Sequence, residues 1–288
     1  MSGLSTRWDW YEMTIEIDGS EIEPPARTAA QMHARSLDRW AGNLAILLGA
    51  RLVSGKARNG YAVCWEVVRG EDVLASVHSH SARAGEIHIT ITSESCDEVV
   101  PAARLLWPRH RVSRADSSVD FAADFAHLDA LAVALAEDAG VSYRLVTDSA
   151  GGATRYLGAP SSELRLRVYK KSEQLVALHP ERAADVPPGI VRVELQARPG
   201  KRDVKEAVSM MEPDDLWGLG GWSAEVAASL LGFEAPRLPT HFRRPTDWAR
   251  SVHYLGVQYG PMASKRAASV GLAQARVEVL AALGLSEG

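Results

Sequence analysis

The sequence predicts an α+β fold: largely antiparallel sheets in two similar halves with packed helices, plus a C-terminal helical segment. Three observations support this prediction. Short segments alternate apolar and polar residues, as half-buried strands do. Turn-forming residues separate several of these segments, as in antiparallel hairpins. Strands followed by helices occur twice along the chain. We therefore expect a main domain over residues 1–235 and the helical segment over 236–288.

The first half is expected to begin with a strand over 9–17, in which Tyr11, Met13 and Ile15 share one face. Apolar residues at spacings of three and four predict a helix up to Leu48, with Gly49 as its C-cap. The expected elements that follow are strands over 60–68, 73–78 and 86–92 and a helix over 97–106.

The second half is expected to repeat this order. The expected strands cover 111–121, 143–147, 163–171 and 189–196, and the expected helices cover 125–137, 201–211 and 223–231. A polar loop is expected between the last two strands. The Gly-rich stretch Trp217–Trp222 lacks the pattern of a phosphate-binding loop and is expected to be a simple connection. Helical pieces are expected from residue 246 onward.

Composition limits the classes of function. Hydrophobic residues make up 46% of the 288 residues and charged residues 24%, which are ordinary globular values. Two cysteines give no disulfide framework, and neither a membrane-spanning run nor a signal peptide is recognised. These features predict a cytoplasmic protein without a membrane partner.

Charge is distributed unevenly along the chain. The net charge of −4 argues against binding nucleic acid through the whole surface. From Arg155 to Lys205, however, eleven Arg and Lys residues face six Asp and Glu residues, a local excess of +5. This stretch is compatible with a local phosphate-binding site.

Two strands in the basic stretch carry the polar side chains of most interest. Strand alternation places Arg165, Arg167 and Tyr169 on one face of the strand over 163–171. It also places Arg192 and Glu194 on one face of the strand over 189–196. A tyrosine among guanidinium groups suits a phosphate, because arginine binds phosphate oxygens bidentately. The plain alternative is a solvated sheet face.

Carboxylates also share one face of the strand over 111–121. Asp116 and Asp120 are like charges that repel each other, which suits a hard cation such as Mg²⁺ or Mn²⁺. The alternative is a salt bridge to Arg114 or to an arginine on the next strand. For Asp116 we favour the metal, and for Asp120 both alternatives stay open. His78 and His80 are a weaker metal-binding pair.

Several motifs in order resemble one family. They are Asp9-Trp10, Arg114-Ala-Asp116 with Val119-Asp120-Phe121, Tyr156-Leu-Gly158 with Ser161-Ser162, Arg167-Val-Tyr169-Lys170, Arg192-Val-Glu194, and Trp248 with Val257-Gln-Tyr-Gly260. This ordered set resembles the replication initiation factors (Rep_trans type) of rolling-circle plasmids and phages, including the related relaxases of integrative and conjugative elements. The sequence departs from the family in having Lys170-Lys171 after the tyrosine.

The resemblance implies a rolling-circle replication initiator or relaxase, with residues 1–235 as the nicking-joining domain. It implies that Tyr169 attacks a scissile phosphate of an origin and forms a 5′-phosphotyrosine, with Arg165 and Arg167 as catalytic cations. The implied ligands of Mg²⁺ or Mn²⁺ are Asp116, Glu194 and Asp120. The expected DNA-binding residues are Lys170, Lys171, Arg192, Arg198, Lys201, Arg202, Arg243 and Arg244.

The expected partner is an origin, double-stranded with a single-stranded or hairpin nick region. A host helicase and a second copy of the chain, in a homodimer, are further possible partners. Two alternatives remain: a catalytically inactive DNA-binding regulator of the same fold, and a nuclease that activates water instead of using the tyrosine.

Overall fold

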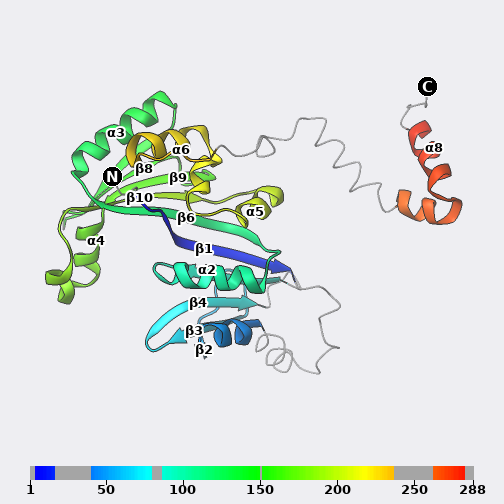
Figure 1. Cartoon of the computed structure of the whole chain (residues 1–288), viewed down its shortest axis with the longest axis horizontal. Helices are drawn as coiled ribbons and strands as arrows, with labels where there is room; N and C mark the ends of the chain where they lie inside the picture. Colours follow the sequence, from blue (N-terminus) through cyan, green and yellow to red (C-terminus); the bar gives the residue numbers. More distant parts are fainter. Residues whose placement is uncertain (1–3, 17–39, 80–85, 150, 237–261, 283–288) are drawn as a thin grey trace. The chain divides into compact units, whose positions relative to one another are not determined.

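The structure, a computed structural model, describes residues 4–16, 40–79, 86–149, 151–236 and 262–282 (Figure 1). The chain divides into two compact units, residues 1–238 and 239–288. Each unit is described by itself. In the second unit, residues 262–270 and α8 (Leu272–Ala282) are helical. Arg243, Arg244, His80, Trp248 and most of the helix expected before Leu48 lie outside the described residues.

The first unit is organised around one ten-stranded sheet, in the order β2-β3-β4-β5-β1-β6-β10-β9-β8-β7. The strands are β1 (Arg7–Glu16), β2 (Arg51–Ser54), β3 (Val63–Arg69), β4 (Asp72–Ser79), β5 (Glu86–Thr92), β6 (Arg111–Ala122), β7 (Tyr143–Thr147), β8 (Ala153–Leu157), β9 (Leu164–Lys170) and β10 (Ile190–Ala197).

The sheet consists of two halves with the same strand order. In each half the first strand pairs with the last, β1 with β5 and β6 with β10, and the intervening strands follow outward to the edge. The halves join through the antiparallel pair β1 and β6. All the strand pairs are antiparallel, which confirms the predicted α+β fold in two similar halves.

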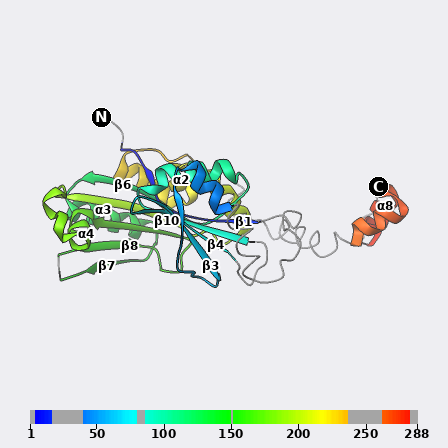
Figure 2. The same cartoon turned by 90° about the horizontal axis from the view of Figure 1, so that it is seen from below.

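Helices cover one face of this sheet (Figures 1 and 2). The helical elements are residues 40–47, α2 (Ser95–Leu106), α3 (Phe125–Asp138), α4 (Lys171–Leu178), η2 (Pro180–Asp185), α5 (Arg202–Val208), η3 (Asp215–Leu219), α6 (Gly221–Val226) and η4 (Ala227–Leu231). On the covered face, Arg104 of α2 lies 5.4 Å from the ring centre of Tyr11, and Asp129 of α3 pairs with Arg155 of β8. The apolar side chains of both halves are buried there.

The opposite face carries polar side chains, as strand alternation predicts for β9 and β10. Across the central strands, Tyr169 lies opposite Arg192 and Arg167 lies opposite Glu194. On the other side of β10, Arg192 lies opposite Asp120. We call this the polar face. The register brings side chains from β6, β9 and β10 together.

Two connections differ from the sequence prediction. The polar loop after the tyrosine strand is instead α4 followed by η2. Ser172 explains how this segment is anchored, because its hydroxyl donates to the Pro187 carbonyl oxygen at 2.5 Å and accepts from the Ile190 N–H at 2.9 Å.

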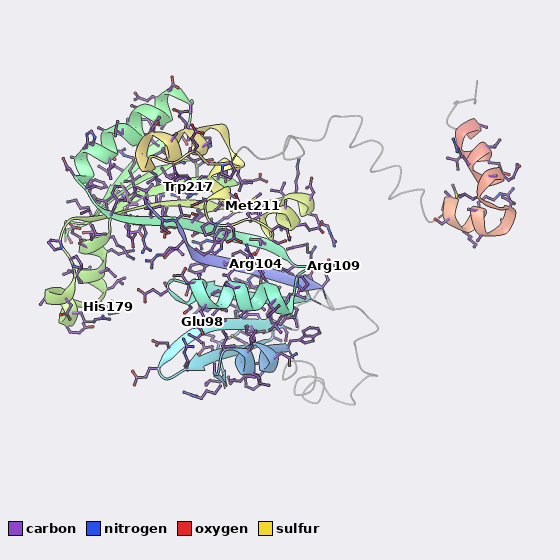
Figure 3. All side chains as sticks on the ribbon, in the orientation of Figure 1. Glu98, Arg104, Arg109, His179, Met211 and Trp217 are labelled. Carbon is purple, nitrogen blue, oxygen red and sulfur yellow. The ribbon has the colours of Figure 1, made fainter. Side chains whose placement is uncertain are left out.

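The Gly-rich stretch Trp217–Trp222 is also not a simple connection. It forms η3 and the start of α6, and Trp217 is fully buried (Figure 3). The indole Nε1–H of Trp217 donates to the Ser117 hydroxyl at 2.9 Å, so the loop is fastened to the middle of β6. Neither β2 nor β8 was predicted, and α5 ends at Val208 rather than 211.

None of the helices in the described ranges is long and apolar enough to cross a membrane.

Candidate active site

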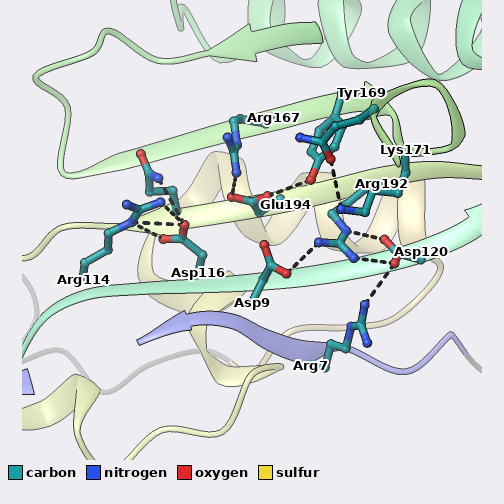
Figure 4. A network of polar contacts seen from close by, with 12 residues as sticks. Arg7, Asp9, Arg114, Asp116, Asp120, Arg167, Tyr169, Lys171, Arg192 and Glu194 are labelled. Atoms are coloured by element: carbon teal, nitrogen blue, oxygen red, sulfur yellow. Dashed lines mark hydrogen bonds and ion pairs between the residues drawn. The ribbon is translucent and has the colours of Figure 1, made fainter. Parts of the chain in front are cut away.

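Tyr169 is the penultimate residue of β9 and projects onto the polar face (Figure 4). Its side chain is buried, with only 5% of the residue exposed. The hydroxyl donates to Glu194 Oε2 at 3.4 Å, and the other oxygen of Glu194 forms an ion pair with Arg167. The tyrosine, the carboxylate and the arginine predicted from the sequence are therefore in contact.

Burial dominates the electrostatics of this group. It raises the pKa of Glu194 to about 7; Arg167 opposes the rise, and the nearby charges of Asp116 and Asp9 add to it. Burial and the charge of Glu194 also raise the pKa of Tyr169 above its ordinary value, against the effect of Arg192 and Arg167. The phenol is thus protonated at neutral pH and needs a proton acceptor or added positive charge to become a nucleophile.

Arg192 connects three strands on the same face. Its guanidinium donates to both carboxylate oxygens of Asp120, at 2.5 and 2.6 Å, and to Asp9 at 2.6 Å. Arg7 adds a contact to Asp120 at 3.2 Å. Although burial raises the pKa of Asp120, the hydrogen bond and charge of Arg192 outweigh it and hold that pKa below its usual value.

Asp9 reaches this network because β1 is irregular. The register with β6 shifts between Trp8 and Trp10, so Trp8 is buried on the helix-covered side while Asp9 and Trp10 both belong to the polar face. The sequence motif Asp9-Trp10 was noted only as part of the resemblance. Strict alternation gave no reason to assign Asp9 to the site.

Asp116 is fully buried and belongs to a second ion pair. Arg114 donates to it at 2.5 to 3.2 Å, and the Gln196 side-chain amide donates to it at 3.2 Å. The guanidinium of Arg114 in turn lies 4.1 Å from the ring centre of Trp10. Asp116 therefore has the arginine partner that was the alternative to a metal.

The predicted metal ligands lie on one face, but each is paired with an arginine. Within the described ranges, no three His, Cys, Asp or Glu side chains are arranged to hold an ion as they stand. The donor type nevertheless suits Mg²⁺ or Mn²⁺, since both ions prefer carboxylate oxygens and the polar face carries the carboxylates of Asp9, Asp116 and Glu194. Asp120 is the least available, because Arg192 and Arg7 occupy it.

The predicted cations divide into two groups. Arg165 and Arg167 share the face of Tyr169. Lys171 lies with its Nζ 5.9 Å from the Tyr169 ring centre, and burial and Arg192 lower its pKa. Lys170 belongs to the other side, where its Nζ lies 5.8 Å from the Phe125 ring centre.

Three further predicted DNA-binding residues follow β10, outside the tyrosine's immediate surroundings. Arg198 and Lys201 are exposed. Arg202 pairs with Glu16, at the far end of β1, and with Glu206.

A cavity of about 600 Å³ lies beside the Arg192 network. Its walls come from both halves of the sheet, from the start of α2 and from α4. The charged residues of the site that line it are Arg7, Asp9, Asp120, Lys171 and Arg192.

Comparison with solved structures finds a similar course of the backbone. No protein-family model matches the chain, and no curated protein matches it significantly. A solved structure titled as a rolling circle replication initiator protein from Geobacillus stearothermophilus aligns with 18% identity and a TM-score of 0.49, over 75% of this chain and 83% of that chain. A likeness at this level concerns only the course of the backbone.

Proposed function

We propose that the protein is a rolling-circle replication initiator or relaxase, which nicks and rejoins one DNA strand through Tyr169. The observation that carries this proposal is the contact of the Tyr169 hydroxyl with Glu194, beside Arg167 and Arg192 on the polar face. A nucleophile, a carboxylate that can take its proton and cations that can bind phosphate are thereby brought together.

In the proposed reaction, the Tyr169 oxygen attacks the scissile phosphorus and its proton passes to Glu194. A bond forms between the tyrosine oxygen and phosphorus, and the bond to the 3′ oxygen breaks. That oxygen takes up a proton from water to leave as a 3′-OH, and Glu194 gives its proton back to solvent. Arg167 stabilises the negative charge that grows on the phosphate. Rejoining reverses these steps.

Mg²⁺ or Mn²⁺ would be held by Asp116 and Glu194, with Asp9 as a further carboxylate whose charge acts on Glu194. When bound, the ion would supply positive charge for the phosphate oxygens. Arg114 and Arg167 would have to yield their carboxylates to the ion. Asp120 serves instead to hold Arg192.

A DNA-binding regulator without catalysis is the second candidate. It is favoured by the arginine partners of Asp116, Asp120 and Glu194, which leave each carboxylate already neutralised.

The experiment uses a supercoiled plasmid that carries DNA from beside this gene, with Mg²⁺ or Mn²⁺. Denaturing gels with and without protease should reveal a nicked strand with protein on its 5′ end, lost in Tyr169→Phe. Nicking that survives Tyr169→Phe would indicate a water-activating nuclease. DNA that is shifted but uncut with either metal would favour the regulator.

A further inference from the structure

The arginines on the polar face differ in whether a carboxylate neutralises them. Around the candidate active site Arg7, Arg114, Arg167 and Arg192 all pair with Asp or Glu side chains. Toward the β7 edge of the sheet, arginines on the polar face lack carboxylate partners among the described residues. Arg144 of β7, Arg165 of β9 and Arg198, just after β10, form no ion pair with any residue of the described part of the chain.

Tyr156 of β8 is the centre of this unpaired group. It lies opposite Arg144 on one side and opposite Arg167 on the other, so it belongs to the polar face. The guanidinium of Arg165 lies 4.0 Å from its ring centre and that of Arg144 lies 5.1 Å away. The aromatic ring therefore holds two guanidinium groups close together without neutralising either.

Arg165 has hydrogen-bond donors with nothing to donate to. Its Nε and Nη2 atoms are buried and lack any partner, and the Nε of Arg167 is in the same condition. Burial lowers the pKa of Arg165, and the charges of Arg144, Arg167 and Arg198 lower it further, although Tyr156 opposes this. Buried N–H groups without acceptors are costly, and an anion is the ligand that would satisfy them.

We propose that Arg144 and Arg165, held against the ring of Tyr156, form together with Arg198 a binding track for the phosphates of single-stranded DNA next to Tyr169. The inference rests on the proposed function for the identity of the strand. Arg165, Arg167 and Tyr169 follow one another at every second residue of β9, about 7 Å apart. This repeat suits the successive phosphates of one extended strand that ends at the tyrosine. A single strand rather than a duplex is favoured because the exposed side chains of Arg144 and Arg198 offer stacking surfaces for unpaired bases.

The test measures binding alone, in the Tyr169→Phe background, with a fluorescent single-stranded 20-mer and a duplex of the same sequence. Each of R144Q and R165Q should weaken binding of the single strand about tenfold. Each should also reduce the slope of log K against log salt by about 0.7, the value for one lost phosphate contact on a single strand. Arg69→Gln is the matched control, because Arg69 is exposed, lies in the other half of the sheet and is already paired with Glu98, and its effect should stay below about twofold.

Several results would overturn the proposal. One is equal effects of R144Q and R69Q; another is an unchanged salt slope in R144Q. Arg144 is exposed on the edge strand β7, so R144Q is expected to fold and a loss of binding can be assigned to the missing charge. If the duplex binds more strongly than the single strand and depends on Arg144 to the same extent, the assignment of the track to single-stranded DNA is overturned. Displacement of the 20-mer by inorganic phosphate at equal phosphate concentration would assign the site to the free ion. This experiment measures binding, and the plasmid experiment measures nicking. A strand that binds through Arg144 while the unaltered protein never nicks DNA would refute the proposed function and leave the track standing.

Discussion

Tyr169 and Glu194, on neighbouring strands β9 and β10, are joined by a hydrogen bond of 3.4 Å in a buried part of the polar face. They are not directly opposite each other in the register, since Glu194 lies opposite Arg167 and Tyr169 lies opposite Arg192. The diagonal contact leaves each carboxylate oxygen with a different partner, one the phenol and the other Arg167. The pairing state of Glu194 therefore affects stability as well as the proposed chemistry.

Glu194→Gln should destabilise the fold by about 3 kcal/mol, because it leaves the charge of Arg167 without its buried partner. Urea denaturation at pH 7.5 measures the free energy of unfolding. Arg167→Met in the Glu194→Gln background should recover part of the loss, since no unpaired charge then remains. A double variant less stable than Glu194→Gln would show that the ion pair does not carry the effect.

Trp217→Phe should cost about 2 kcal/mol in the free energy of unfolding, from the lost hydrogen bond to Ser117 and the space left by the indole. Ser117→Ala provides the control, since in that background the hydroxyl is already absent and the cost of Trp217→Phe should fall. Equal costs in the two backgrounds would mean that the hydrogen bond contributes nothing measurable.

Gly158→Ala should destabilise the hairpin that carries Tyr156 and β9. Gly158 has φ of +89°, and an added Cβ would lie 2.8 Å from the Leu164 carbonyl oxygen. We expect a loss of about 2 kcal/mol or more in the free energy of unfolding. The matched control is Gly140→Ala, where φ is +63° but nothing lies within 4 Å, so about 1 kcal/mol is expected. Equal losses would rule out the contact with Leu164 as the cause.

Acidification should weaken the first half of the sheet through His78 and His88. Burial lowers the pKa of both imidazoles; His88 and Arg58 lower that of His78 further, whereas Glu12 and Glu86 oppose the change at His88.

The sign of this effect follows from proton linkage. The unfolded chain binds protons on these imidazoles at higher pH than the folded chain does. Stability is therefore full above about pH 6.5 and falls as the pH drops toward the lowered folded values. Urea denaturation at pH 7.5 and 5.5 should show a smaller loss for His78→Gln than for the unaltered protein. The same loss in both proteins would contradict a contribution from His78.

The sequence predicted the polar face well and its connections poorly. Alternation fixes which residues of β9 and β10 share a face, so Arg167, Tyr169 and Glu194 could be grouped from the sequence alone. The register shift at Trp8 adds Asp9 to the site, and a shift of this kind leaves no mark in an alternating pattern.

The missed segments depend on contacts with distant residues. α4 carries little apolar periodicity of its own and is anchored through Ser172 to Pro187 and Ile190. Trp217 reads as part of a Gly-rich loop until its hydrogen bond to Ser117, a hundred residues earlier, is known. The arginine partners of Asp116 and Asp120 were alternatives that only the register could select between.

The central claim is that Tyr169 is the nucleophile. The most direct measurement is to incubate the protein with Mn²⁺ and a single-stranded oligonucleotide from its own nick region, and to map the resulting adduct by mass spectrometry of protease fragments. We predict a 5′-phosphate-linked nucleotide on the peptide that contains Tyr169, and no adduct in Tyr169→Phe. An adduct on another residue such as Tyr156, or cleavage of the oligonucleotide with no adduct at all, would contradict the claim.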